Sequence, residues 1–429
     1  MKNPILLCLS ALCAMSMFTA CGNDDDPKVP GEALPEKTYT VANGLNITVD
    51  GEEAYGQAVT FTPGNGGSAT ITIAGQGLDL SSLIGGIMRS DNTPGMLLPT
   101  ASVIPGSVQV TVPVVLEGDS DNVTFSGNYE TEYCSFAYAG MMTADAMALD
   151  VKNVVLKNTT LAGTYDMNDF DGKYYNVCRM EWYSENKLMV DMGFGVPIPF
   201  EMKAIMAVML GGYPLIEIDG EKMNVLNALN AVIKSVTLGN DGSVIAEYGD
   251  TGVDGLPVKT SAKGLAQYVV TSDNQMRLIL NPYAIIAASA GDNSRAEGEG
   301  EIDPSVLLEK LLPVAENLLP KLIPLLSQGI PVSYGPALVP DEEDDSEMVP
   351  SDDPNFVSFY LDTNTLLPIL KDIAPLLGDD DVVNFIVQAA SQDPEMGSMA
   401  GMLPPILKSL PDVINTTSKV ELGLNLQKR

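Results

Sequence analysis

Segments in which apolar residues alternate with polar residues or threonine recur through the first part of this 429-residue chain. Examples are YTVANGLNITVDGEE and AVTFTPGNGGSATITIAG, where Gly, Asn and Pro separate the alternating runs. Alternation with a period of two places one set of side chains on each face of a strand, so each run predicts a half-buried β-strand. The recurrence predicts an all-β domain at residues 38–158, either a β-sandwich or a small barrel.

Strands continue in a second predicted domain, residues 159–429. Alternating arms around turn residues predict hairpins at 178–194, with the turn at Ser184 to Asn186, at 235–248 and at 264–282. We expect the final strand, KVELGLNLQK, to pair with the first strand of this domain and to close a barrel.

Apolar segments with helical spacing separate these strands. Their internal prolines predict kinks, and none is long enough without interruption to span a membrane. They occupy residues 200–212, 221–233, 304–328, 365–378, 380–390 and 401–414. Polar insertions at 291–301 and 340–354 predict loops. The expected fold class is therefore mainly β, α+β overall, with helices packed on the barrel.

The N-terminus carries an export pattern. Lys2 and the apolar run Ile5 to Phe18 predict a signal peptide at residues 1–20. Phe18-Thr19-Ala20-Cys21 resembles a bacterial lipobox, which implies acylation of Cys21 and a membrane-lipid partner. The alternative is an ordinary secreted protein with a free Cys21 thiol.

The residues after Cys21 predict a disordered tether over 21–37, because Pro, Glu, Lys and Gly dominate it and three aspartates begin it. This run resembles the acidic run just after the acylated cysteine of Bacteroidetes-type lipoproteins, which looks like a signal for export to the outer face. The alternative, a plain spacer, stays open. The expected location is the outer membrane, on the cell surface or the periplasmic face.

Composition excludes several classes of function. The net charge of −33 excludes nucleic-acid binding as a main activity, because the phosphate backbone would be repelled. The chain has no histidine, which removes Ser-His-Asp and Cys-His triads and histidine metal ligands. Neither a phosphate-binding loop nor a dinucleotide fingerprint is present, so no cofactor is predicted.

No metal site is predicted either. Asp166 to Gly172 brings several oxygens together, but Phe170 stands where a third ligand of a calcium loop should be. A strand-exit turn is the favoured interpretation, and a weak Ca²⁺ site is the alternative. Cys134 and Cys178 could pair, but buried free thiols are favoured because the two cysteines fall in different predicted domains.

The aromatic residues give one candidate ligand site. Trp182, the only tryptophan, alternates with Met180 along a predicted strand and adjoins Tyr183. Such a cluster could stack on a sugar or cover an apolar ligand, with an adaptable methionine such as Met206 beside it. The alternative is that all of these side chains belong to the core.

The lipobox with its acidic tether, the Tyr-Thr-rich opening strands, the Leu161-Ala162-Gly163-Thr164-Tyr165 segment and the closing strand together carry a family resemblance. The chain is similar to uncharacterised Bacteroidetes-type lipoproteins with calycin-like, that is lipocalin-like, β-barrels. Tyr165 stands where a lipocalin usually has the Trp of Gly-x-Trp. The resemblance implies a calycin-like barrel for residues 159–429, with the helices as insertions.

These observations predict a non-enzymatic envelope lipoprotein that binds a small apolar ligand or a glycan in a helix-capped barrel. The expected barrel holds an enclosed, largely apolar cavity of several hundred Å³. One alternative is a structural or adhesive protein of the envelope whose β surfaces meet another protein. An enzyme that uses paired carboxylates is a further alternative.

Overall fold

The computed structural model describes residues 29–79, 97–191, 195–214, 216–218, 221–249, 258–285, 318, 320–344, 347–392 and 400–429. The predicted signal peptide, Cys21 and most of the tether lie outside the described residues. So do the loop predicted at 291–301 and the first part of the helix predicted at 304–328.

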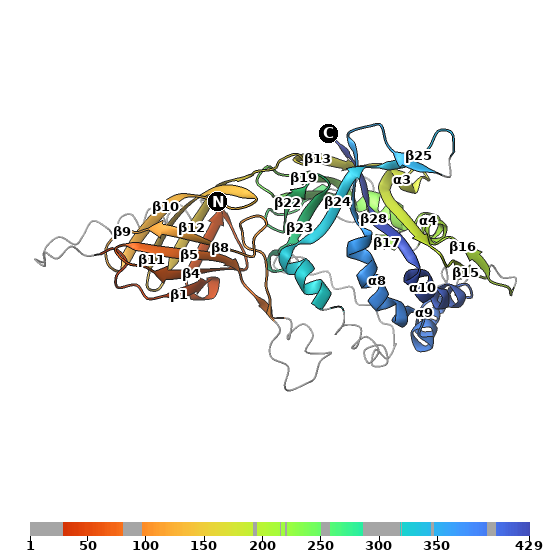
Figure 1. The fold of residues 1–429 in the computed structure, drawn as a ribbon, viewed down its shortest axis with the longest axis horizontal. Helices are drawn as coiled ribbons and strands as arrows, with labels where there is room; N and C mark the ends of the chain where they lie inside the picture. Colours follow the sequence, from red (N-terminus) through yellow and green to blue (C-terminus); the bar gives the residue numbers. More distant parts are fainter. Residues whose placement is uncertain are drawn as a thin grey trace, which may run out of the picture.

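The N-terminal strands form two sheets that pack face to face as a β-sandwich (Figure 1). The first sheet contains, in spatial order, β1 (Lys37–Thr40), β4 (Gln57–Pro63), β5 (Ser68–Gly75) and β8 (Gln109–Val115). The second contains β3 (Glu52–Glu53), β2 (Leu45–Val49), β12 (Met147–Leu156), β11 (Cys134–Thr143), β10 (Asn122–Glu130) and β9 (Glu117–Gly118).

Alternation sets the two faces of this sandwich as the sequence predicts. In the first sheet, Phe61 and Ile71 are opposite each other and buried, while Thr60 pairs with Thr72 on the other face. A cross-sheet hydrogen bond from the Tyr138 hydroxyl to the Pro113 carbonyl, at 3.2 Å, joins the two layers. The sandwich alternative is therefore the one that the structure adopts.

A larger sheet of ten strands follows. Its spatial order is β21 (Val258–Thr260), β20 (Val244–Gly249), β19 (Ile233–Leu238), β13 (Gly163–Met167), β28 (Thr417–Lys428), β27 (Phe356–Leu361), β24 (Ile330–Pro336), β23 (Gln275–Leu280) and β22 (Ala266–Ser272). The tenth strand, β14 (Cys178–Ser184), pairs with β28 beside β13. The prediction of a mainly β, α+β fold is confirmed.

The large sheet is curled but is not a closed barrel within the described residues, so the predicted closure is wrong. The last strand does pair with the first, since Tyr165 of β13 lies opposite Lys428 of β28. That pairing joins two halves in the middle of the sheet instead of sealing its edges. A single β-bridge, between Ser243 and Gln267, links the β19–β20 hairpin near one end of the sheet to β22 at the other end.

Two of the three predicted hairpins are confirmed. β19 pairs with β20 around Gly242, which has a positive φ of 82°, and β22 pairs with β23. The hairpin predicted around Ser184 to Asn186 is wrong, since β14 pairs with β28 and not with the strand that follows it. The following strand, β15 (Leu188–Val190), pairs with β16 (Ile198–Phe200) instead. The remaining two-stranded ribbons are β17 (Ile216–Ile218) with β18 (Glu221–Met223), β25 (Leu338–Pro340) with β26 (Met348–Pro350), and β6 (Leu78–Asp79) with β7 (Leu97–Leu98).

Helices pack on the large sheet at the end of the molecule away from the sandwich (Figure 1). They are α3 (Tyr174–Val177), α4 (Met202–Gly212), α5 (Val225–Val232), α8 (Thr363–Leu377), α9 (Asp380–Gln392) and α10 (Leu403–Asn415); a 3₁₀ turn, η1 (Val41–Asn43), lies in the sandwich. The side chain of Asp362 caps α8 by accepting from the Thr365 amide at 3.0 Å. Among the described helices, none has both the length and the hydropathy needed to cross a membrane.

The sandwich and the large sheet share one hydrophobic core, which includes Ile104 on one side and Tyr268 on the other. The Leu156 amide donates to the Asn240 carbonyl at 2.9 Å across the junction. The Lys263 ammonium lies 2.7 Å from the carboxylate of Asp241 and 3.5 Å from that of Asp50 in the sandwich. The hairpin tip at Asn240 to Gly242 is therefore held against the sandwich.

Candidate functional site

The inner face of the curled sheet lines a half-open cavity of about 410 Å³, not the enclosed one that the sequence predicts. Seven strands contribute to it, namely β13, β19, β20, β23, β24, β27 and β28. Its aliphatic lining includes Val236, Leu238, Leu278, Val332, Leu422 and Leu424. The size falls within the usual range for a small-molecule site and agrees with the predicted several hundred Å³.

The register of β27 and β28 explains why hydrocarbon fills this face. Phe359 lies opposite Leu424 and Leu361 lies opposite Leu422, and residues opposite each other in an antiparallel pair point to the same side. The alternation in SFYLD therefore places Phe359 and Leu361 in the cavity together. This local signal could have identified both residues from the sequence, but our sequence analysis did not select them.

Aromatic side chains form one wall of the cavity. The rings of Tyr165 and Phe359 meet edge to face, with centroids 5.1 Å apart. The Tyr165 hydroxyl donates to the Leu161 carbonyl at 2.8 Å, so its polar atom is satisfied within the protein. Burial raises the pKa of Tyr165 to about 12, which keeps this wall uncharged near neutral pH. Tyr165 is the residue that the lipocalin resemblance placed at the Trp position.

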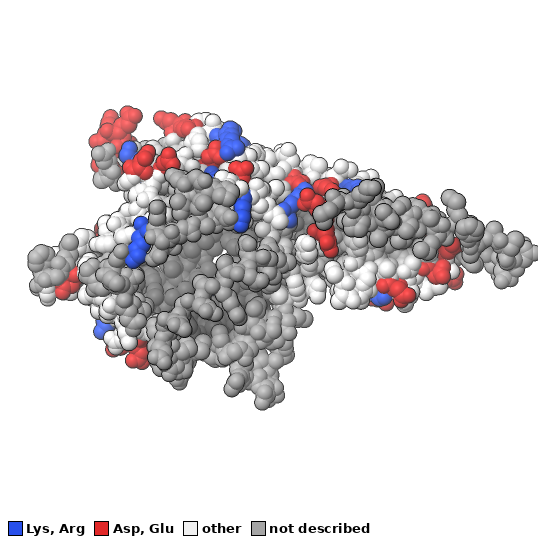
Figure 2. All heavy atoms as spheres, turned by 180° about the vertical axis from the view of Figure 1, so that it is seen from behind, with Lys and Arg blue, Asp and Glu red and all other residues white. Residues whose placement is uncertain are grey.

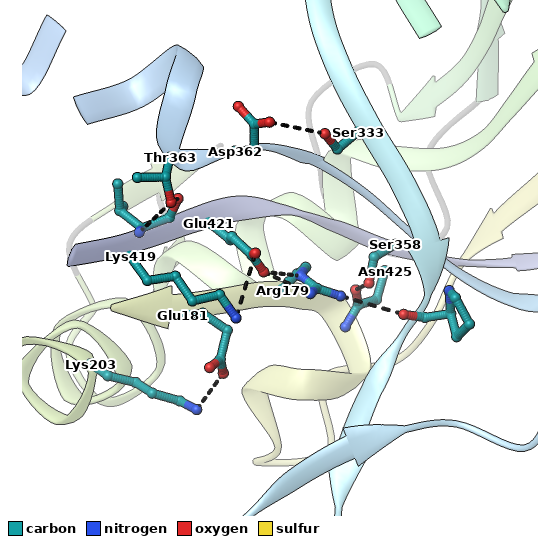
Figure 3. Close-up of polar contacts among 12 residues, drawn as sticks. Arg179, Glu181, Lys203, Ser333, Ser358, Asp362, Thr363, Lys419, Glu421 and Asn425 are labelled. Carbon is teal, nitrogen blue, oxygen red and sulfur yellow. Dashed lines mark hydrogen bonds and ion pairs between the residues drawn. The ribbon is translucent and has the colours of Figure 1, made fainter. Parts of the chain in front are cut away.

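A row of charged side chains on β14 and β28, called the polar row, consists of Arg179, Glu181, Lys419 and Glu421 (Figure 3). Arg179 donates from Nε to the Glu421 carboxylate at 2.8 Å, and its guanidinium lies 4.1 Å from the centre of the Tyr360 ring. The buried Glu181 accepts from the Lys203 ammonium of α4 at 2.5 Å.

The polar row contributes no charged side chain to the cavity. Tyr360 and Gly423 do line the cavity, and these two residues are opposite each other in the β27–β28 ladder. Arg179 lies opposite Gly423 on the other edge of β28. The row therefore lies beside the cavity wall, where Arg179 and Lys419 pair with Glu421, while Glu181 pairs with Lys203 of α4. This arrangement leaves the cavity suited to uncharged, apolar molecules.

The three residues proposed from the sequence lie elsewhere. Trp182 is buried against α8 and α10, and its Nε1 donates to the Thr417 hydroxyl at 2.8 Å. Met206 of α4 is partly buried and packs against two apolar clusters, one that contains Met180 and one that contains Trp182. Tyr183 is 51% exposed, with the Lys419 ammonium 5.6 Å from its ring. None of the three lines the cavity.

The structure also places the two cysteines and the first residue of the calcium candidate. Cys134 and Cys178 are both buried and unpaired, which agrees with the favoured interpretation of free thiols. Asp166, the first residue of the weak calcium candidate, forms an ion pair with Arg429 at 2.7 Å. Within the described ranges, no group of three or more Asp, Glu or Cys side chains could hold a metal ion.

The surface carries the charge imbalance of the chain. On the face shown in Figure 2, acidic side chains form several groups, and the described basic side chains between them are scattered. A negative field of this kind repels anions that approach the protein.

No family model, curated protein sequence or solved structure matches the chain.

Proposed function

We propose that this chain is an envelope lipoprotein, anchored through acylated Cys21, that binds a small apolar ligand inside its curled sheet and catalyses no reaction. The observation that carries the proposal is the 410 Å³ cavity, whose lining is hydrocarbon from seven strands. Transfer of an apolar ligand from water to such a surface is favourable by roughly 25 cal/mol per Å² buried. The lipobox pattern supports the anchor, and the absence of histidine supports a role in binding.

The lining favours an apolar ligand over a glycan. Each sugar hydroxyl that loses its water without gaining a partner costs about 1–3 kcal/mol. Tyr165, one of the two tyrosines that line the cavity, already donates to Leu161, and the aliphatic side chains offer no partner. Trp182, which could stack on a sugar, is covered by helices.

The cavity also favours binding over a purely adhesive role. An unfilled apolar cavity reduces stability, and larger side chains at positions such as Val236 or Val332 would remove that cost. A protein that needs only its outer surface gains nothing from the empty volume. A ligand that enters the cavity restores the lost contacts.

Dye binding tests the proposal. The full chain with Cys21→Ala, which needs no detergent if the anchor is correct, is titrated with N-phenyl-1-naphthylamine, an uncharged dye that brightens on leaving water. A ligand of about 15 non-hydrogen atoms at roughly 0.4 kcal/mol per atom binds with about 6 kcal/mol, a Kd of tens of micromolar. We expect saturable binding in that range.

Leu278→Trp fills the cavity and should weaken dye binding at least tenfold, and Val236→Phe gives the same test with a smaller intrusion. Val115→Trp is the matched control, because Val115 is 73% exposed on β8 of the sandwich. Circular dichroism verifies that each variant is folded. Absence of saturable binding to the parent chain, or equal binding by Leu278→Trp and Val115→Trp, would overturn the proposal.

A further inference from the structure

The hydrophobic core of the protein forms the inner end of the cavity. Five of the side chains that line the cavity are buried and belong to the core that the large sheet shares with the sandwich. They are Tyr165, Leu238, Met276, Val332 and Leu426. Leu238 lies two residues before Asn240, whose carbonyl accepts from the Leu156 amide of the sandwich. A molecule that enters the cavity therefore meets buried hydrocarbon at the end that faces the sandwich.

The lining becomes more exposed along β28, away from the sandwich. Leu426 is buried, whereas Leu424 and Leu422, earlier in the same strand, are partly exposed. Leu361 lies opposite Leu422 and is also partly exposed, and α8 follows it at the end of the molecule away from the sandwich (Figure 1). Four residues of strand span about 13 Å. The cavity thus has a buried inner end near Leu426 and an outer end at Leu361 and Leu422.

The lining offers a ligand no free hydrogen-bonding side chain. The Tyr165 hydroxyl already donates to the Leu161 carbonyl, and the thioether of Met276 is only a weak acceptor. Tyr360 follows Phe359 in β27, so its ring points to the opposite face of the sheet, where the Arg179 guanidinium lies 4.1 Å from its centre. A polar group inside the cavity would lose its water and gain no partner.

We propose that the ligand is a single-chain amphiphile whose hydrocarbon tail fills the cavity and whose polar head stays in water beyond Leu361 and Leu422. The inference rests on the proposed function and specifies its ligand class. The tail leaves water for an apolar surface, which is favourable, and the head keeps its hydration because the cavity is half-open. The protein then distinguishes ligands by the length of the tail and not by the head.

The volume of the cavity sets the length of that tail. A methylene group in a packed interior occupies about 27 Å³, so a cavity of about 410 Å³ holds about 15 carbons. Each added methylene should strengthen binding about fourfold while the cavity has room for it. Beyond about 15 carbons the tail should protrude into water, and the gain should stop.

A series of tail lengths tests this limit. Alkyl maltosides with 8 to 18 carbons, each below its critical micelle concentration, are titrated into the full Cys21→Ala chain by isothermal calorimetry. Leu278→Trp fills about 60 Å³ of the cavity, the room of about two methylene groups, so its limit should fall to about 13 carbons. Val115→Trp, exposed on the sandwich, is the matched control and should keep the limit of the parent chain.

Ligands with a second hydroxyl test the orientation of the tail. 1,12-Dodecanediol would place one hydroxyl at the inner end, whereas 1,2-dodecanediol keeps both hydroxyls at the head. We expect 1,12-dodecanediol to bind at least about tenfold more weakly than 1,2-dodecanediol, because its inner hydroxyl would lack a partner. Dodecyl maltoside and dodecylphosphocholine should bind within about threefold of each other, because both heads stay in water.

The two proposals fail in different ways. If neither the dye nor any maltoside binds the parent chain, the proposed function is wrong. If the dye binds but the two diols have equal affinity, only the amphiphile inference is wrong, because the inner end would then accept a polar group. The same holds if the parent chain and Leu278→Trp share one length limit, or if the two dodecyl ligands differ more than tenfold.

Discussion

Among the described glycines, Gly423 is the one at which an added Cβ atom would lie nearest to a backbone atom. It lies in β28, opposite Arg179 on one edge and Tyr360 on the other, in the middle of the large sheet. A Cβ atom added there would lie 2.0 Å from the Phe359 carbonyl oxygen and 2.4 Å from the Tyr360 Cα atom. Both neighbours are backbone atoms, so no side-chain rotation can relieve the overlap.

The cost of Gly423→Ala follows from that geometry. To reach ordinary contact, β27 must move more than about 1 Å from β28, which is the upper end of overpacking, about 3 kcal/mol. Loss of one ladder hydrogen bond adds about 1 kcal/mol. We therefore expect a loss of about 4 kcal/mol in the free energy of unfolding. With a urea m-value of about 3 kcal/mol/M, the midpoint falls by about 1.3 M.

Urea unfolding followed by the fluorescence of Trp182 measures this loss. Trp182 is the only tryptophan, and it lies opposite Val420 in the β14–β28 ladder. Gly335→Ala is the control, because Gly335 lies in β24 of the same sheet with open space where the Cβ would stand. We expect it to change stability by less than about 1 kcal/mol. Equal midpoints for the two variants would refute the close-packing argument.

Two further predictions concern the cysteines. Burial raises the pKa of the Cys178 thiol from 9.0 to about 12, so above pH 9 the unfolded chain loses a proton that the native state keeps. The stability that this thiol contributes is complete below pH 9 and is lost as the pH rises towards 12. In urea titrations, the free energy of unfolding should therefore fall less between about pH 8 and pH 10.5 for Cys178→Ala than for the parent chain. Equal losses in the two proteins would exclude this cause. Cys21→Ala should move the protein from the membrane fraction to the soluble fraction of its native cells, and unchanged partitioning would refute the anchor.

The sequence predicted those parts of the fold that depend on local patterns. The strands of the sandwich and the hairpins at 235–248 and 264–282 follow from alternation and from turn residues such as Gly242. Helices α4, α5, α8, α9 and α10 follow from apolar spacing. In each case the decisive interactions lie within a few residues along the chain.

Features that depend on distant partners were not predictable in the same way. Nothing near Ser184 shows that β14 pairs with β28, more than 200 residues later, or that β15 pairs with β16. The parallel pairing of β2 with β12 is likewise non-local. Barrel closure failed for the same reason, since it depends on two edges that no local pattern relates.

The candidate site was only partly predictable. An apolar cavity in the second domain was expected, but its lining was assigned to the lone tryptophan and its neighbours. Trp182 instead fills the space between β14 and the helices, where a large side chain with one donor fits the Thr417 hydroxyl.

The place of β28 bears on how the protein is made. Residues 417–428 come after every other described strand of the large sheet along the chain, yet they form its centre, between β13, β14 and β27. Until they are synthesised, the two halves of that sheet have no strand to join them. The sheet therefore cannot be completed before β28 is added, and removal of β28 would divide the sheet instead of trimming its margin.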